Sequence, residues 1–227
     1  MTSPPELRLL PREFFARPSL AVAADLLGCV IAHEAPEGTV AVRLTEAEAY
    51  AGESDPASHA YHGRTARNAV MFGPPGHVYV YFTYGMHWCM NLVCQGRPGP
   101  SAVLLRAGQV IDGVPLASAR RAGRLTRAAP REIDLARGPA RLCEALAVDR
   151  SQDGADAADP ASPLRAFAAP RPVPAAGISR GPRVGVSRAA EVNWRFWVTG
   201  DPTVSPYRPY VARRAAAKPD PRPGPQS

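Results

Sequence analysis

The run from Val40 to Tyr50 constrains the fold of this chain more than any other stretch. If it forms a β-strand, the side chains at its even positions share one face of a sheet. Those side chains are Val40, Val42, Leu44, Glu46, Glu48 and Tyr50. An apolar stripe therefore leads straight to two carboxylates, which are costly to bury unless they are partnered or used. The pattern predicts a strand that carries two acids inward.

Two interpretations of Glu46 and Glu48 follow from the residues alone. They can be structural acids that form salt bridges with arginines. They can also include a general base, because a desolvated glutamate beside tyrosines can hold and deprotonate a water molecule. The spacing by itself leaves both interpretations open.

The rest of the chain predicts further elements around this strand. Helical spacing over 11–28, broken near Pro18, predicts two short helices, and Gly28 can end the second. A strand over 29–33 is expected to form a hairpin with the Val40 run. Further strands are expected at 78–84, 88–93, 102–105, 183–186 and 195–198, and helices at 116–127 and 138–146.

Three segments have distinct expectations. Residues 84–87 are expected to form a hairpin tip from which Tyr84 protrudes, and Arg106 is expected to end its strand. Residues 151–181, rich in alanine, proline and aspartate, are expected to be irregular. Residues 1–210 are expected to form one domain and residues 211–227 a disordered tail.

Composition narrows the function. The net charge is +7, and the segment from Arg106 to Arg141 contains eight arginines but only three acidic residues. Such an excess suits a polyanionic partner, although a solvated helical face would carry the same residues. No apolar run approaches the roughly 20 residues needed to cross a membrane, and no secretory signal is evident, so we expect a cytoplasmic protein. The four cysteines show no metal-binding spacing and are expected to be reduced and buried.

Aromatic residues gather around the acids. Residues 40–106 contain four of the five histidines and five of the seven tyrosines. Tyr50, His59 and Tyr81 offer flat surfaces that can grip a planar ring, and Tyr84 on a hairpin tip suits a wedge into a base stack. Each of these residues, taken alone, more often only packs against its neighbours in a folded protein. Together, in a basic protein, they favour an enzyme that extracts a base from DNA.

Several ordered motifs strengthen this interpretation. They are Glu46-Ala47-Glu48-Ala49-Tyr50, the segments 67–72, 75–81 and 84–91, Leu104-Leu105-Arg106, Phe14-Phe15, and the segments 138–143 and 182–186. The chain thereby resembles the alkyladenine (3-methyladenine) DNA glycosylase family of the mammalian type, over roughly residues 12–206. It departs from the family pattern at Trp88, and segment 151–181 matches no motif of the family.

The resemblance implies an α+β fold, a single mixed domain around a curved antiparallel β-sheet with surrounding helices and a protruding β-hairpin. It implies that Glu48 activates a water molecule and that Arg106 helps to hold the water and the nucleotide. It further implies an intercalating Tyr84, and a base pocket formed by Tyr50, His59, Tyr81 and Asn91, with the Asn91 amide crowding the amino group of guanine.

The implied activity is hydrolysis of the N-glycosidic bond of a damaged purine in double-stranded DNA. No cofactor, metal or membrane is implied, and we expect a cytoplasmic monomer that is associated with the bacterial nucleoid when bound to DNA. A glycosylase that also nicks the strand needs an amine nucleophile, and the only lysine, Lys218, lies in the expected tail. Strand cleavage is therefore not expected, although the amine of the N-terminus stays open.

Two other functions are compatible with parts of the sequence. A metal site could draw on His59, His62, His77, His87 and Cys89, but the His-x-x-His spacing lies in a loop without a carboxylate companion. A DNA- or RNA-binding protein without catalytic activity would need only a basic surface and exposed tyrosines. Metal analysis tests the first and base release from lesion-containing duplex tests the second.

Overall fold

The computed structural model describes residues 7–83, 85–95, 99–123 and 130–211, and these form one mixed α+β domain, as predicted. Its centre is a sheet of nine strands in the described part of the chain, with antiparallel pairing throughout. The main path runs β3-β4-β5-β2-β1-β7, with β6 beside β5 and the pair β8–β9 beside β2. Their bounds are β1 Val30–Ala35, β2 Gly38–Tyr50, β3 Val78–Thr83, β4 His87–Gln95, β5 Pro100–Asp112, β6 Ala136–Arg137, β7 Leu164–Phe167, β8 Ile178–Gly181 and β9 Arg195–Val198.

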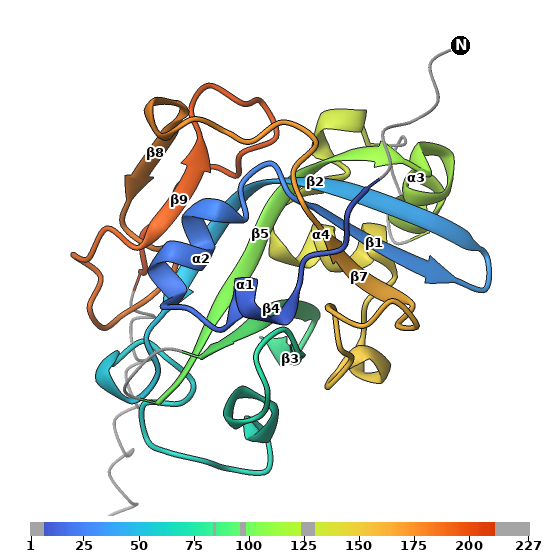
Figure 1. Ribbon diagram of the computed structural model, residues 1–227. Coiled ribbons are helices and arrows are strands. Elements are labelled where there is room, and N and C mark those ends of the chain that lie inside the picture. The colour runs from blue at the N-terminus through green and yellow to red at the C-terminus, as the bar shows by residue number, and fades with distance from the viewer. Residues whose placement is uncertain (1–6, 84, 96–98, 124–129, 212–227) are drawn as a thin grey trace, which may run out of the picture.

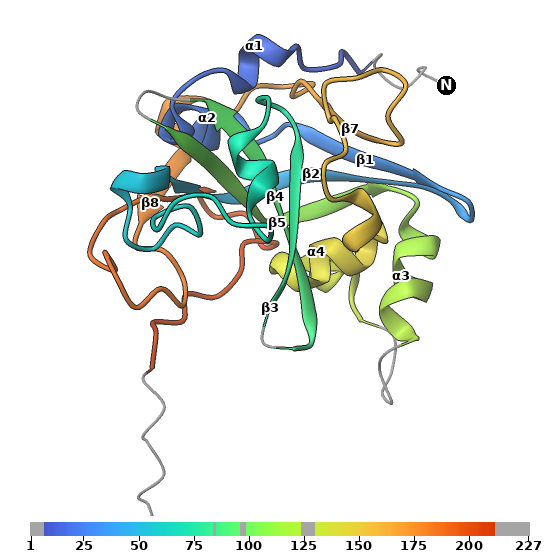
Figure 2. The same ribbon diagram turned by 90° about the horizontal axis from the view of Figure 1, so that it is seen from below.

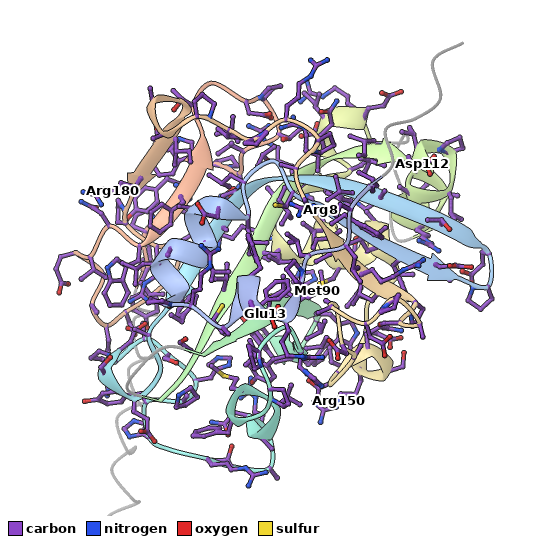
Figure 3. The ribbon with its side chains drawn as sticks, in the orientation of Figure 1. Arg8, Glu13, Met90, Asp112, Arg150 and Arg180 are labelled. Atoms are coloured by element: carbon purple, nitrogen blue, oxygen red, sulfur yellow. The ribbon has the colours of Figure 1, made fainter. Side chains whose placement is uncertain are left out.

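Four α-helices of the described chain cover the two faces of this sheet. Helices α1 (Arg12–Phe15) and α2 (Ser19–Asp25) lie on one face, and α3 (Val114–Ala122) and α4 (Pro139–Leu146) on the other (Figures 1 and 2). Since both faces are covered, apolar side chains on both sides of the sheet are buried. Met90 of β4 lies inside the molecule, whereas Arg150 and Arg180 lie at its edge (Figure 3).

Strand β2 confirms the predicted strand and is the longest, together with β5. Its pairing with β5 is irregular around Glu46, yet Leu44 faces Gly108 and Ala47 faces Leu105, so the register is the same on both sides of the irregularity. Arg106 contacts both Glu46 and Glu48, and Tyr50 contacts Glu48. The side chains of Glu46, Glu48 and Tyr50 therefore lie on one face of β2, as the alternation predicts.

Most of the other expected elements are confirmed. Helices α1 and α2 are separated near Pro18, and the expected hairpin joins β1 to β2 at Ala35 and Gly38. Strands β3 and β4 form the second hairpin, in which Thr83 pairs with His87. Helix α4 and strand β9 also form as expected. All four cysteines are buried and free.

Three expectations are wrong. Strand β5 does not end at Arg106 but continues to Asp112, because β2 and β6 both pair with its second half. Segment 183–186 is a loop, because the Arg183 side chain turns inward to Asp55 and Gly185 has a positive φ of 71°. Segment 151–181 is only partly irregular, since it contains β7 and β8. In β7, buried Leu164 and Ala166 alternate with less buried neighbours, a short strand pattern that the surrounding prolines obscure.

Some expectations lie outside the described residues. These are the position of Tyr84 and the tail beyond residue 211. The helix expected at 116–127 is α3, which begins earlier, at Val114, and ends earlier, at Ala122, with Gly123 as its C-cap. Within the described chain, no helix is long and apolar enough to cross a membrane.

Candidate active site

A pocket of about 610 Å³ lies between the β3–β4 hairpin, the end of β2, the first half of β5, the loop 56–62, the start of α4 and the loop after β8. This volume falls within the range typical of sites for small organic ligands. Five predicted site residues line it, namely Tyr50, His59, Tyr81, Asn91 and Arg106. Strands that lie far apart in the sequence thus bring these side chains together.

Glu48 lies directly behind this lining and is fully buried. Its Oε2 accepts a hydrogen bond of 2.9 Å from the Tyr50 hydroxyl, and its Oε1 accepts one of 2.7 Å from the backbone N–H of Val184. The Arg106 Nη1 lies 3.3 Å from Oε1. All three partners line the pocket. The buried carboxylate therefore has two hydrogen-bond donors and one guanidinium as its partners.

Tyr50 ends β2 and places its ring at the pocket wall. Burial, and then the charge of Glu48, raise the pKa of Tyr50 well above its ordinary value, so its hydroxyl is a donor at neutral pH. The chain can turn away just after it only because residue 52 is glycine. A Cβ on Gly52 would lie 1.6 Å from the carbonyl oxygen of Pro100, and φ there is +67°.

A second wall of the pocket is aromatic. The His59 ring lies 4.5 Å from the Tyr81 ring, edge to face, and its Nδ1 lies 3.1 Å from the Tyr79 hydroxyl. Burial, and to a lesser extent the charge of Arg67, lower the pKa of His59, so the imidazole is neutral at pH 7. Burial also raises the pKa of Tyr81. This wall offers uncharged rings to a planar ligand.

Asn91 of β4 lines the pocket and is 5% exposed. Its Nδ2 donates a hydrogen bond of 3.2 Å to the carbonyl oxygen of Tyr79 on the paired strand. The amide is thus held in one orientation against the pocket.

Glu46 has a different environment from Glu48. Its Oε1 accepts hydrogen bonds from Arg106 Nε at 2.6 Å, Arg195 Nε at 2.7 Å and the Ser205 hydroxyl at 2.9 Å, and its Oε2 accepts one from the Ser205 N–H at 2.7 Å. Burial alone would raise the pKa of Glu46, but Arg106, Arg195 and Ser205 outweigh burial and hold it below its ordinary value. Neither glutamate lines the pocket itself, but all three partners of Glu48 do, whereas Arg195 and Ser205, which contact Glu46, are not among the lining residues of the described chain. This arrangement agrees with the structural interpretation of Glu46.

Arg106 joins the two acids. Its side chain is 7% exposed, and it contacts Glu46 through Nε and Glu48 through Nη1. Burial disfavours its charge, but the two carboxylates outweigh burial and raise the pKa of Arg106, so it stays a cation. The site therefore contains one permanent positive charge between two buried negative charges.

The arginine-rich stretch from Arg106 to Arg141 is only in part a free basic surface. Five of its eight arginines form ion pairs with carboxylates, and two lie outside the described residues. The five are Arg106, Arg120, Arg121, Arg131 and Arg137. Arg141 is exposed on α4, close to Pro139 and Ala140 of the pocket. Most of the described arginines in this stretch are thus neutralised by ion pairs within the protein.

No group of three or more His, Cys, Asp or Glu side chains in the described chain is arranged to hold a metal ion. Four of the five residues considered for a metal site in the sequence analysis line the pocket, namely His59, His62, His87 and Cys89. They are spread along the aromatic wall and the hairpin.

Comparison with known proteins shows the family to which this chain belongs. Residues 13–202 match the family described as "Methylpurine-DNA glycosylase (MPG)". The chain belongs to the methylpurine-DNA glycosylase family. The resemblance inferred from the motifs is confirmed.

Similar proteins support the same membership. A "Putative 3-methyladenine DNA glycosylase" of Streptomyces avermitilis is 55% identical over 215 residues, which cover 94% of this chain and 99% of that protein. Proteins with the same name from Leifsonia xyli and Methanocella arvoryzae are 49% and 43% identical, with 88% of this chain covered in each case and 93% and 98% of the relatives. This glycosylase is thus an enzyme that hydrolyses N-glycosyl bonds in DNA, and the non-catalytic alternative is wrong.

The sequence motifs did not indicate every group at the site of this methylpurine-DNA glycosylase. The N–H of Val184 that donates to Glu48 is a backbone group, and no residue type signals it. Thr83, His87 and Leu104 also line the pocket. Each lies two residues from another lining residue on β3, β4 or β5 and therefore on the same face of its strand. Once one pocket residue on a strand was known, the alternation would have identified them.

Proposed function

We propose that this enzyme flips alkylated or deaminated purines out of duplex DNA and hydrolyses the N-glycosidic bond with a water molecule activated by Glu48. The products are the free base and an abasic site. The enzyme acts as a monomer without a cofactor. The observation that carries the proposal is the buried Glu48 carboxylate, which touches three groups of the pocket lining.

Glu48 suits both requirements of the reaction. Departure of the base leaves oxocarbenium character on the sugar, and a nearby carboxylate stabilises that positive charge. The same carboxylate accepts a proton from the attacking water. Arg106 holds the carboxylate through Nη1 and, with Glu46 on its other side, keeps one orientation. Water then adds to the sugar carbon while the base leaves with the bonding electron pair.

The walls of the pocket suit a purine. Tyr50, His59 and Tyr81 enclose the space for a flat ring, and the neutral His59 adds no charge repulsion toward a cationic base. Purines alkylated on a ring nitrogen carry a positive charge, which makes them good leaving groups and is attracted to the faces of tyrosine rings. Binding and chemistry therefore both favour alkylated bases.

Asn91 is proposed to exclude normal guanine. Since its amide is held by the Tyr79 carbonyl, it cannot turn away from an amino group in the pocket. We expect Asn91→Ser to increase release of guanine from undamaged duplex by about tenfold, while hypoxanthine release changes by less than about threefold. Ser101→Ala, a substitution of a buried strand residue outside the pocket lining, is the control. Unchanged guanine release in Asn91→Ser contradicts the role.

Tyr84 is proposed to fill the gap left by the flipped nucleotide. Thr83, which precedes Tyr84 in the sequence, pairs with His87, so the described strands β3 and β4 end on either side of the proposed wedge. We expect Tyr84→Ala to weaken binding to lesion duplex by about tenfold or more, with the melting temperature of the protein unchanged. Equal losses of binding and thermal stability would instead make Tyr84 a core residue.

The substrate range is tested by release of free base from four duplexes. These contain 3-methyladenine, 7-methylguanine, hypoxanthine or ethenoadenine at one position. We expect release of both methylated bases above the level seen with undamaged duplex. We also expect release of hypoxanthine, of ethenoadenine, or of both. Release of pyrimidines alone, or of no base, would contradict it.

A further inference from the structure

Arg183 is a buried charged residue to which the proposed chemistry assigns no role. It follows β8 and is 1% exposed. Its Nη1 donates hydrogen bonds to Asp55 Oδ2 at 2.6 Å and to the Ala49 carbonyl at 3.0 Å, and its Nη2 donates to Asp55 Oδ1 at 2.9 Å. Its Nη2 also lies 3.5 Å from the Ala189 carbonyl. We name these residues, Arg183, Asp55, Ala49 and Ala189, the Arg183 clamp.

The clamp joins three segments that each supply part of the pocket wall. Ala49 immediately precedes Tyr50 of the lining. Asp55 belongs to the loop that leads to His59, and its carboxylate also accepts hydrogen bonds from the N–H groups of Ala51 and Ala57. Ala189 closes the loop whose residues 184–188 line the pocket. One guanidinium therefore fixes the relative positions of all three segments.

The clamp also reaches the proposed catalytic group. The guanidinium carbon of Arg183 lies 4.7 Å from the Tyr50 ring centroid and 5.1 Å from that of Trp194, so the cation packs between two aromatic rings. Arg183 is not part of the pocket lining among the described residues, so it supports Tyr50 from outside the pocket. The next residue, Val184, donates its N–H to Glu48. A shift of Arg183 would displace both the Tyr50 ring and a donor to Glu48.

We propose that Arg183, paired with Asp55, is a positioning residue that holds the walls of the base pocket and the Val184 N–H in the arrangement needed for lesion capture and base release. This inference rests on the proposed function of the pocket. It assigns to a buried ion pair a role in recognising the damaged base, although neither side chain touches that base.

Arg183→Lys tests the inference, because lysine keeps the charge but lacks the planar fork of two nitrogens with which Arg183 binds both Asp55 oxygens. Arg121→Lys is the matched control, since Arg121 is also buried in an ion pair, with Glu144, away from the pocket. We expect Arg183→Lys to lower the ratio of lesion-duplex to undamaged-duplex affinity about tenfold, and the single-turnover release rate about tenfold. Arg121→Lys should lower the melting temperature and leave both quantities unchanged.

The measurements use the lesion that the release assay ranks first, at a temperature well below both melting points. The affinity ratio is measured in a Glu48→Gln background, so that it is independent of chemistry. If Glu48→Gln releases base at the parent rate, the proposed role of Glu48 fails while the affinity ratio still tests the clamp. If Arg183→Lys does not fold, Asp55→Glu, which moves the carboxylate by one methylene, is expected to lower the ratio in the same direction. An affinity ratio and a release rate equal to those of Arg121→Lys would overturn the inference.

Discussion

Glu48→Gln is expected to lower single-turnover base release by about a thousandfold, within the range of about 10² to 10⁴ for loss of a general base. Glutamine keeps the shape of the side chain. Its carbonyl oxygen can replace Oε1 as acceptor for the Val184 N–H, and its NH2 group, in the place of Oε2, can donate to the Tyr50 hydroxyl, which is able to rotate and accept. Glutamine cannot accept a proton from water, and it carries no charge to stabilise the sugar cation. Affinity for lesion-containing duplex is expected to stay within about threefold of the parent.

Release and affinity are measured on the same lesion duplex. Glu37→Gln is the control, because Glu37 is an exposed glutamate in the turn between β1 and β2. It should match the parent in both assays. Base release by Glu48→Gln at the parent rate would show that another group activates the water.

Arg106→Gln is expected to destabilise the fold by about 3–5 kcal/mol, because it removes the cation between two buried carboxylates. For a chain of this size, the loss corresponds to a fall of roughly 10 °C in melting temperature. Arg43→Gln is the control. Its ion pair with Asp201 is partly exposed, so its loss should stay within about 1 kcal/mol. Equal losses in both variants would show that Arg106 contributes no more than a surface pair.

The penalty of Arg106→Gln should depend on pH. The fold holds the pKa of Glu46 below its ordinary value, so the stability from this carboxylate is present above the pKa of an unfolded glutamate, about 4.3. It is lost as pH falls through the lower pKa of the folded state. The difference in unfolding free energy between parent and variant should therefore be full at pH 7 and should shrink below about pH 4. Urea unfolding at both pH values measures it, and a constant difference would exclude the Glu46 contribution.

The sequence predicted those parts of the site that follow from local periodicity. The alternation from Val40 to Tyr50 placed Glu46, Glu48 and Tyr50 on one strand face, and the arrangement of their contacts agrees. The hairpin from Val78 to Val93 was predicted for the same reason, and it brings Tyr81 and Asn91 to the pocket.

Contacts between distant segments could not be predicted from those patterns. The difference between the two glutamates depends on Arg195 and Ser205, about 150 residues later, which donate to Glu46, whereas the three partners of Glu48 all line the pocket. The inward turn of Arg183 replaces the strand that its apolar neighbours suggested. In each case a long-range ion pair outweighs a local preference, and no spacing in the sequence reports it.

The proposed reaction is tested most directly by product analysis of a duplex that carries one 3-methyladenine, after incubation with the purified parent enzyme. We predict free 3-methyladenine and a strand that stays intact until alkali cleaves it at the abasic site, with neither product from Glu48→Gln. Strand cleavage without alkali, or release of the base by both proteins at equal rates, would contradict this prediction.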